Sequence, residues 1–185
     1  MAGSRFRYFG LVTSPRIQSR FQVRFDWGLD GARVISDGAH IIVWADALTT
    51  PGAPDPLAID GPAVIAATQG SAAAAAQWIL DQQAAIGDRA IVAVVAAGTD
   101  DGRFAVEDLL AAGSVVDALS TLGIDSTSPE AAAASAAFEG LRNATLHLLS
   151  ASVTGQELEA GAIAAAKEAA MSTELRILRE FSLPA

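Results

Sequence analysis

The stretch Ile91–Gly113, IVAVVAAGTDDGRFAVEDLLAAG, decides the fold class of this chain. Its apolar start predicts a buried strand over Ile91–Ala96, a Gly-Thr-Asp-Asp-Gly turn follows, and a helix is predicted over Val106–Leu119. Four carboxylates accordingly follow the carboxyl end of the strand: Asp100, Asp101, Glu107 and Asp108. Because open α/β sheets bind ligands at this end of their strands, we expect any chemistry of the chain here.

The alternation of strand and helix continues on the amino-terminal side of this stretch. Further strands are predicted at Phe21–Trp27, Ile41–Ala45 and Ala63–Thr68, and helices at Gly28–Asp37 and Ala72–Ala85. Thr49–Pro62 contains four prolines and two glycines, which predicts a loop. Strands that alternate with helices favour a three-layer α/β fold, with a mostly parallel sheet and helices on both faces.

Two helix starts are predicted on the carboxyl-terminal side. Ser128-Pro129-Glu130 combines a capping hydroxyl, a proline in the first turn and an acid at the positive end of the helix dipole. We expect this helix to continue to about Ser150. Thr154-Gly155-Gln156-Glu157 has the spacing of a capping box and is predicted to open the next helix. Residues 172–185 are expected to form a final strand or an arm.

Length and composition indicate one domain over residues 1–185, with residues 1–20 as an arm or edge strand. The chain has no cysteine, which excludes disulfides, thiolate nucleophiles and cysteine-based zinc sites. A net charge of −9 argues against nucleic-acid binding. No apolar run reaches the roughly 18 residues of a membrane helix, and the amino terminus lacks the apolar segment of a signal peptide. We therefore expect a soluble cytoplasmic protein, and the sequence leaves a homodimer open.

Three predicted strand ends carry polar groups that suit one kind of site. Asp46 follows the second strand, Gln69-Gly70-Ser71 follows the third, and Thr99 follows the fourth. Magnesium is held by one or two carboxylates with water and substrate phosphate, and backbone amides before a helix bind anionic oxygens. These groups would together suit phosphoryl chemistry.

Each of these residues also has a purely structural interpretation. Asp46 is typical of turns and caps, and Glu107 and Asp108 are expected in a first helical turn from the dipole alone. As neighbours on a helix they point about 100° apart, so at most one is expected to bind a metal. His40 and His147 are interpreted as structural, and Arg103 and Arg142 as binding either a second anionic group or a surface acid.

Several fragments in order resemble the 2-phosphosulfolactate phosphatase family. These are FQVRFDWG, IIVWADALTT, QGSAAAAAQWI, VVAAGTDDGRFAVEDLLAAGSVVDAL, SPEAAAASAAF and TGQELEAG. The match is best from Gln69 to Gly161, and the AAGTDDGRFAVEDLLAAG segment is its specific part. The resemblance implies an α/β fold and a magnesium-dependent acid phosphatase, which releases phosphate from 2-phospho-3-sulfolactate on the route to coenzyme M.

The family motifs map unevenly onto this chain. The family's Val-Ile-Asp-Val-Leu-Arg-Ala-Thr-Thr resembles Trp44–Thr50, which keeps the aspartate as Asp46 and has no counterpart of the arginine. Its Asn-Gly-Ser/Thr resembles Gln69-Gly70-Ser71, and its Ala-Gly and Leu-Glu-Asp elements resemble Ala97-Gly98 and Val106-Glu107-Asp108. A later aspartate is replaced within Ala164–Ala166, and the segment between Asp46 and Ile59 is shortened by a helix and a strand.

These observations lead to one main hypothesis and two alternatives. The main hypothesis is a magnesium-dependent phosphatase of a small phosphorylated acid. Its predicted residues are Asp46 and Glu107 for catalysis, metal ligands drawn from Asp46, Glu107 and Asp108, and Gln69, Gly70, Ser71, Thr99 and Arg103 for the substrate. One alternative is a catalytically degenerate homologue that serves as a scaffold or ligand-binding subunit. The other is a small-ligand sensor that uses the same pocket without chemistry.

Overall fold

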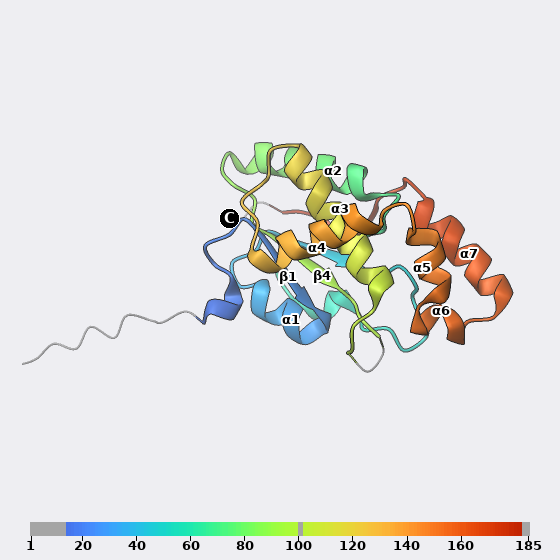
Figure 1. The fold of residues 1–185 in the computed structure, drawn as a ribbon. Coiled ribbons are helices and arrows are strands. Elements are labelled where there is room, and N and C mark those ends of the chain that lie inside the picture. Colours follow the sequence, from blue (N-terminus) through green and yellow to red (C-terminus); the bar gives the residue numbers. More distant parts are fainter. Residues whose placement is uncertain (1–13, 100–101, 183–185) are drawn as a thin grey trace, which may run out of the picture.

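A computed structural model of the chain describes residues 14–99 and 102–182. Its core is a five-stranded sheet whose strands alternate with helices in the amino-terminal half (Figure 1). The strands are β1 (Val23–Trp27), β2 (Ile41–Ala45), β3 (Ala63–Ala67), β4 (Val92–Ala96) and β5 (Arg176–Arg179). The helices are α1 (Gly28–Ile35), α2 (Ala72–Ile86), α3 (Val106–Thr121), α4 (Pro129–Leu141), α5 (Thr145–Ala151), α6 (Val153–Glu157) and α7 (Ala160–Met171). Two 3-10 turns lie at Pro15–Ile17 and Pro56–Ala58.

The sheet is mostly parallel, as predicted. Its strand order is β1-β4-β2-β3-β5. β1 to β4 run parallel, and β5 pairs antiparallel with β3. The carboxyl ends of β2, β3 and β4 therefore meet at one edge of the sheet. The expected tail beyond Ser172 forms β5, an edge strand of the sheet beside β3, which confirms one of its two predicted forms.

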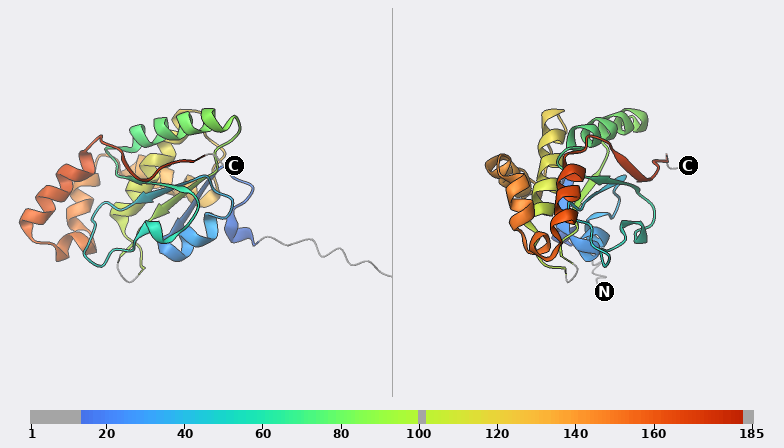
Figure 2. Two further views of the ribbon diagram at one scale, coloured as in Figure 1. Left: turned by 180° about the vertical axis from the view of Figure 1, so that it is seen from behind. Right: turned by 90° about the vertical axis from the view of Figure 1, so that its right-hand side faces the viewer.

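Helices cover both faces of the sheet, which confirms the α/β fold. On one face, residues from alternate strand positions pack with α2 and α3 and with two alanines of α4. On the other face, the remaining strand positions pack with Ala32 and Ile35 of α1 and with Ile59 of the loop after β2. Figure 2 shows these layers from behind and from the side. β2 and β4 are apolar and fully buried, and β3 is nearly so, because both faces of these strands are covered.

α3 is buried on nearly every side because it lies between the sheet and α4. Gly113 marks the closest approach of the two helices, since a Cβ there would lie 2.1 Å from the carbonyl oxygen of Ala134. The predicted cap of α4 is confirmed: the Ser128 hydroxyl accepts a hydrogen bond from the Ala131 nitrogen at 3.1 Å. α4 ends at Leu141, however, and not near Ser150 as predicted. The chain turns at residues 142–144 before α5 begins. Gly140 precedes this turn and Asn143 lies in it, and both residue types favour helices weakly.

The predicted capping box at Thr154 is wrong in its position. Ser152 is the N-cap, and its hydroxyl accepts a hydrogen bond from the Gly155 nitrogen at 3.1 Å. Thr154 lies inside the short helix α6, and the longer helix α7 begins only at Ala160. The two hydroxyl residues stand two positions apart, and the earlier one has the extended backbone that a cap requires.

α5, α6 and α7 gather at one end of the molecule, beyond the carboxyl ends of the parallel strands (Figure 1). A small apolar cluster joins them to the loop after β2: Leu48 packs with Leu149 of α5 and Ala170 of α7. The rest of that loop is held by Arg179 of β5, whose guanidinium donates to the carbonyl oxygens of Leu57, Ile59 and Pro62. The apolar cluster and the Arg179 hydrogen bonds together hold the segment that follows Asp46 in place.

No helix within the described ranges combines the length and the apolar character needed to cross a membrane. Asp100 and Asp101, which the sequence placed in the turn after β4, lie outside the described residues.

Candidate functional site

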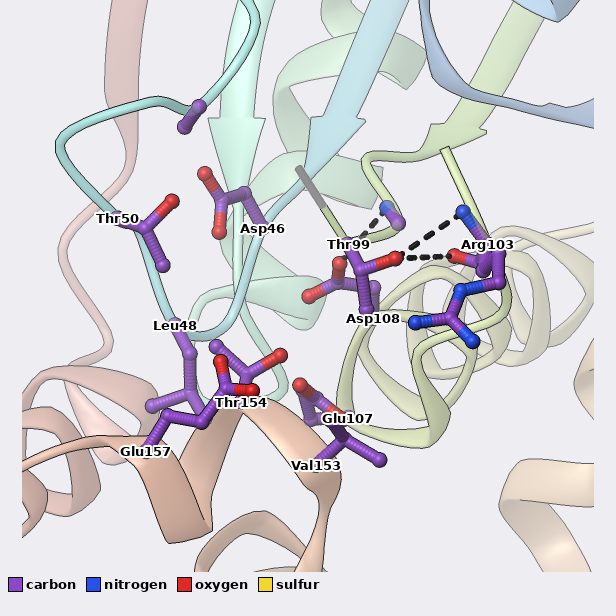
Figure 3. A pocket seen from close by; sticks show the side chains of 12 residues that line it. Asp46, Leu48, Thr50, Thr99, Arg103, Glu107, Asp108, Val153, Thr154 and Glu157 are labelled. Carbon is purple, nitrogen blue, oxygen red and sulfur yellow. Dashed lines mark hydrogen bonds between the residues drawn. The ribbon is translucent and has the colours of Figure 1, made fainter. Parts of the chain in front are cut away.

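A cavity of about 190 Å³ opens at the carboxyl ends of β2 and β4 (Figure 3). Its walls come from the loop after β2, the loop between β4 and α3, the first turn of α3, and α6. The residues that line it are Asp46, Leu48, Thr50, Ala53, Gly98, Thr99, Arg103, Glu107, Asp108, Val153, Thr154 and Glu157. Four of these are acids, so the cavity has a strongly acidic lining.

The strand order explains why a cavity forms here. β2 and β4 are neighbours in the sheet, but the segments that follow them turn to opposite faces. The chain after β4 enters α3 on one face, and the chain after β2 brings Ile59 to the other. Neighbouring strands whose connections diverge leave a crevice at their carboxyl ends, which is where open α/β sheets bind ligands. A cavity thus lies where the sequence predicts the site.

Asp108 is built into the frame of the cavity. Its Oδ1 accepts a hydrogen bond from the Ala47 nitrogen at 2.8 Å, and its Oδ2 accepts one from the Gly98 nitrogen at 2.9 Å. Burial raises the pKa of Asp108 well above its usual value, the two backbone donors oppose that rise, and the nearby charges of Asp46 and Glu107 add to it. Both carboxylate oxygens are therefore engaged by backbone amides of the segments that leave β2 and β4.

Asp46 lies at the end of β2 and is half-buried beside this frame. Burial raises its pKa above 3.8, and hydrogen bonds from the Thr49 side chain and the Leu48 backbone oppose the rise. Glu107 also raises the Asp46 pKa, whereas Arg176 of β5 lowers it, so both charges lie close to this carboxylate. The charge state of Asp46 thus responds to an acidic and to a basic side chain.

Glu107 carries the most informative side chain of the cavity. It is only 3% exposed, and its Oε2 is buried with no hydrogen-bond partner among the residues that the structure describes. A buried carboxylate oxygen without a donor is costly, and native proteins rarely retain one without a reason. A ligand with positive charge or with a hydrogen-bond donor would satisfy this oxygen. Glu107 and its neighbour Asp108 therefore play different parts, as their helical spacing predicts.

The loop between β4 and α3 forms the opposite wall. The Thr99 hydroxyl accepts a hydrogen bond from the Arg103 nitrogen at 3.0 Å, and the Thr99 nitrogen donates to the Arg103 carbonyl oxygen at 3.0 Å. Gly98 has φ of +77°, and a Cβ there would lie 2.8 Å from the Arg103 oxygen, so this loop requires glycine. Thr99 and Arg103, both predicted to bind substrate, thus line the same cavity as Asp46 and Glu107.

The predicted phosphate cradle at Gln69-Gly70-Ser71 lies outside the acidic cavity, and one of its amides is engaged within the chain. The Gly70 nitrogen donates to the Ala170 carbonyl oxygen at 2.8 Å, so this amide is used to hold the end of α7. A Cβ on Gly70 would lie 2.4 Å from the Met171 carbonyl carbon, which explains the glycine by close packing. The Ser71 hydroxyl accepts a hydrogen bond from the Thr68 nitrogen at 3.0 Å. None of the three residues lines the acidic cavity, although Ser71 lines a neighbouring one and Gln69 has a buried Oε1 without a partner among the described residues.

The sequence did not single out three residues that the fold brings to this region. Thr154 and Glu157 of α6 line the acidic cavity, although their spacing in the sequence predicts a helix cap. Arg176 affects the Asp46 carboxylate from β5, at a position with no local pattern to mark it. Conversely, the His40 Nδ1 accepts a hydrogen bond from the Ile91 nitrogen at 2.9 Å, which agrees with its structural interpretation.

The acidic lining can be compared with what magnesium requires. Within residues 14–99 and 102–182, no three acidic or histidine side chains are arranged to hold one metal ion together. Magnesium, however, is usually held by one or two carboxylates, with water and phosphate oxygens as the other ligands. Asp46 and the unpartnered Glu107 fit that smaller set, whereas Asp108 is engaged by backbone amides. The donor set therefore fits a magnesium ion that is shared with a phosphorylated ligand.

The sequence profile of the 2-phosphosulpholactate phosphatase family matches residues 56–178, which spans β3 to β5 and includes Glu107, Asp108 and Glu157. The matched range begins after Asp46. No curated protein gave a significant match. Since the profile covers about two thirds of the chain, the protein belongs to the 2-phosphosulpholactate phosphatase family.

Proposed function

We propose that this chain is a magnesium-dependent phosphatase that acts on a small phosphorylated acid. The observation that carries the proposal is the Glu107 carboxylate, which is buried, has an unpartnered oxygen and lines the same cavity as Asp46. Family membership supports a phosphatase activity. The acidic lining supports a cation, since four acids around one cavity would repel a phosphate ester on its own.

Each part of the cavity has a proposed task. Asp46 and Glu107 would hold the magnesium ion, which when bound neutralises phosphate oxygens and lowers the pKa of a coordinated water. Arg103 and Thr99 would contact the ligand from the β4–α3 loop. Asp108 keeps the two loops at a fixed separation through its bonds to Ala47 and Gly98. Glu157 would lie beside the reacting group on α6.

Release of inorganic phosphate from small phosphate esters tests this proposal. We expect magnesium-dependent turnover of at least one ester, with 2-phospho-3-sulfolactate included in the panel because of the family match. Glu107→Gln keeps the size of the side chain but removes its charge, and should lower turnover by at least about 100-fold. Glu139→Gln is the matched control, since Glu139 is an exposed acid of α4 far from the cavity. Turnover that is independent of magnesium, or unchanged in Glu107→Gln, would refute the proposal.

A second candidate is a homologue that binds a ligand without turning it over and serves as a scaffold, sensor or subunit. Three observations favour it: the family arginine after Asp46 has no counterpart, the Gly70 amide is engaged by Ala170, and no three acids form a metal-binding group in the described part of the chain. Calorimetric titration with magnesium and a phosphate analogue separates these functions. A pure scaffold should bind neither, and a sensor should bind both without releasing phosphate.

A further inference from the structure

A second and larger cavity, of about 520 Å³, adjoins the acidic one. Asp46 and Leu48 line both cavities, so the two meet at the segment that leaves β2. The second cavity lies between α7 and the carboxyl ends of β2 and β3. One face of α7 contributes Ala162, Ala165, Ala166 and Ala169, whose small side chains leave this space open.

The lining of the second cavity differs from that of the first. Alanines and leucines form most of its walls, and the hydroxyls of Thr49, Thr68 and Ser71 are placed near the strand ends. Its charged side chains are Asp46, Glu174 and Arg176. The volume and the largely apolar walls fit the carbon body of a ligand better than a phosphate group, which the acidic cavity would hold with a metal.

Arg176 is the basic group of this cavity. It lies on β5, where it pairs with Ala66 of β3, and it lines the cavity together with Asp46, whose pKa it lowers. Within the described residues Arg176 forms no salt bridge. An exposed guanidinium beside an apolar cavity is suited to bind a carboxylate through charge and paired N–H donors.

We propose that the alanine-lined cavity binds the carbon body of the substrate and that Arg176 binds an anionic group carried by that body. The substrate class is then a phosphate monoester with an apolar, ring-sized body and a carboxylate remote from the phosphate. This proposal rests on the proposed function, because it takes the acidic cavity with the unpartnered Glu107 oxygen as the phosphate site. Arg176 supplies positive charge where the chain lacks the family arginine after Asp46.

Glu174 sharpens this assignment. It lines the same cavity from the segment just before β5, two positions before Arg176. Its charge opposes an anionic ligand, so the structure selects a carboxylate placed nearer to Arg176 than to Glu174. Glu174→Gln should therefore increase the affinity for such a ligand, whereas Arg176→Gln should decrease it.

Phosphonates, which carry a carbon–phosphorus bond that a phosphatase does not cleave, test the proposal by calorimetry in magnesium buffer. Benzylphosphonate is compared with its 3-carboxy and 4-carboxy derivatives. We expect at least one carboxylated compound to bind about threefold to tenfold more tightly than benzylphosphonate. This advantage should disappear in Arg176→Gln and persist in Arg89→Gln, which changes an exposed arginine before the amino end of β4 that lines neither cavity.

The body of the ligand is tested on α7. Ala165→Leu adds bulk to the wall of the cavity and should weaken the binding of all three phosphonates by about tenfold or more, whereas Ala164→Leu adds the same side chain at a neighbouring position outside the lining. Equal affinities of the three phosphonates, no loss in Arg176→Gln, or equal effects of the two leucine variants would overturn the proposal, as would the absence of saturable binding. Binding that depends on Arg176, in a protein that hydrolyses no ester, would support this ligand site while refuting the enzyme.

Discussion

The Oδ1 of Asp108 lies 2.8 Å from the nitrogen of Ala47, 61 positions away along the chain. Its Oδ2 lies 2.9 Å from the Gly98 nitrogen. One carboxylate at the start of α3 therefore joins the two segments that diverge from β2 and β4. The width of the acidic cavity depends on this contact, because those segments form two of its walls.

Removal of the Asp108 carboxylate should destabilise the fold. Asp108→Ala leaves the partly buried Ala47 and Gly98 N–H groups without their acceptor, and each lost hydrogen bond costs about 1–3 kcal/mol. Removal of the buried charge recovers part of this cost. We expect the free energy of unfolding in urea to fall by about 2–4 kcal/mol. Asp117→Ala on the same helix is the control and should change it by less than about 1 kcal/mol. Equal effects of the two variants would contradict the structural role of Asp108.

Magnesium should stabilise the protein through Glu107. At a magnesium concentration near 100 times the dissociation constant, ligand binding adds about 2.7 kcal/mol, which corresponds to a rise in Tm of about 5–10 °C for a chain of this size. Glu107→Gln should unfold at a Tm equal to or above that of the wild type without metal, since a buried carboxylate oxygen without a donor is removed. The variant should also show no magnesium shift in thermal denaturation. A shift of the same size in both proteins would place the metal elsewhere.

The buried acids should make stability depend on pH in a defined direction. The pKa of Asp46 is raised in the folded state, so between 3.8 and that raised value the unfolded chain binds fewer protons than the folded one. The free energy of unfolding then falls as the pH rises through this window, by at most about 1.4 kcal/mol per pH unit for each such group. Asp108 contributes in the same direction.

Asp46→Asn removes the contribution of Asp46 to this pH dependence and leaves that of Asp108. We expect its free energy of unfolding in urea, with metal removed by a chelator, to decline less than that of the wild type between pH 4 and pH 7. The exposed Asp60→Asn should keep the wild-type pH dependence. A steeper decline in Asp46→Asn than in the wild type would show that the sign is wrong.

The contact between α3 and α4 provides a matched pair of glycine substitutions. In Gly113→Ala the new methyl group would clash with the backbone of Ala134, so α3 and α4 must move apart. We expect this to lower the free energy of unfolding by about 1–3 kcal/mol or more. Gly140→Ala adds the same methyl group on α4 where nothing lies within 4 Å, and should stabilise the helix by up to about 1 kcal/mol. Opposite signs in denaturant unfolding are expected. A neutral Gly113→Ala would show that α3 and α4 are less closely packed than the structure has them.

The sequence predicts the sheet well because its signals there are local. Ile41–Ala45 is a short, continuous apolar run between polar residues, and the observed strand has the same bounds. The prediction of one long helix up to Ser150 is wrong because the local signals there are weak. The alanine-rich segment is compatible with one helix throughout, and its weak local signals near Gly140 do not fix where α4 ends and α5 begins.

The site is predictable only where parallel strands bring residues together. Asp46 and Glu107 follow neighbouring strand ends, so the general rule for α/β sheets places them at one cavity. The same rule does not predict the role of Gly70, because its amide donates to the carbonyl oxygen of Ala170, on a helix far away in the sequence. Arg176 reaches the site because an antiparallel strand returns along β3, and a local pattern carries no information on such pairing.

The pairing of Ala66 with Arg176 also has a consequence for the order of folding. During synthesis from the amino terminus, β1 to β4 can assemble long before β5 is available, so β3 remains an unpaired edge for most of that time. An unpaired apolar edge is a template for association with other chains. The strand that completes the sheet is also the one that carries Arg176. Protection from aggregation and acquisition of the proposed ligand site would therefore arrive in the same late step.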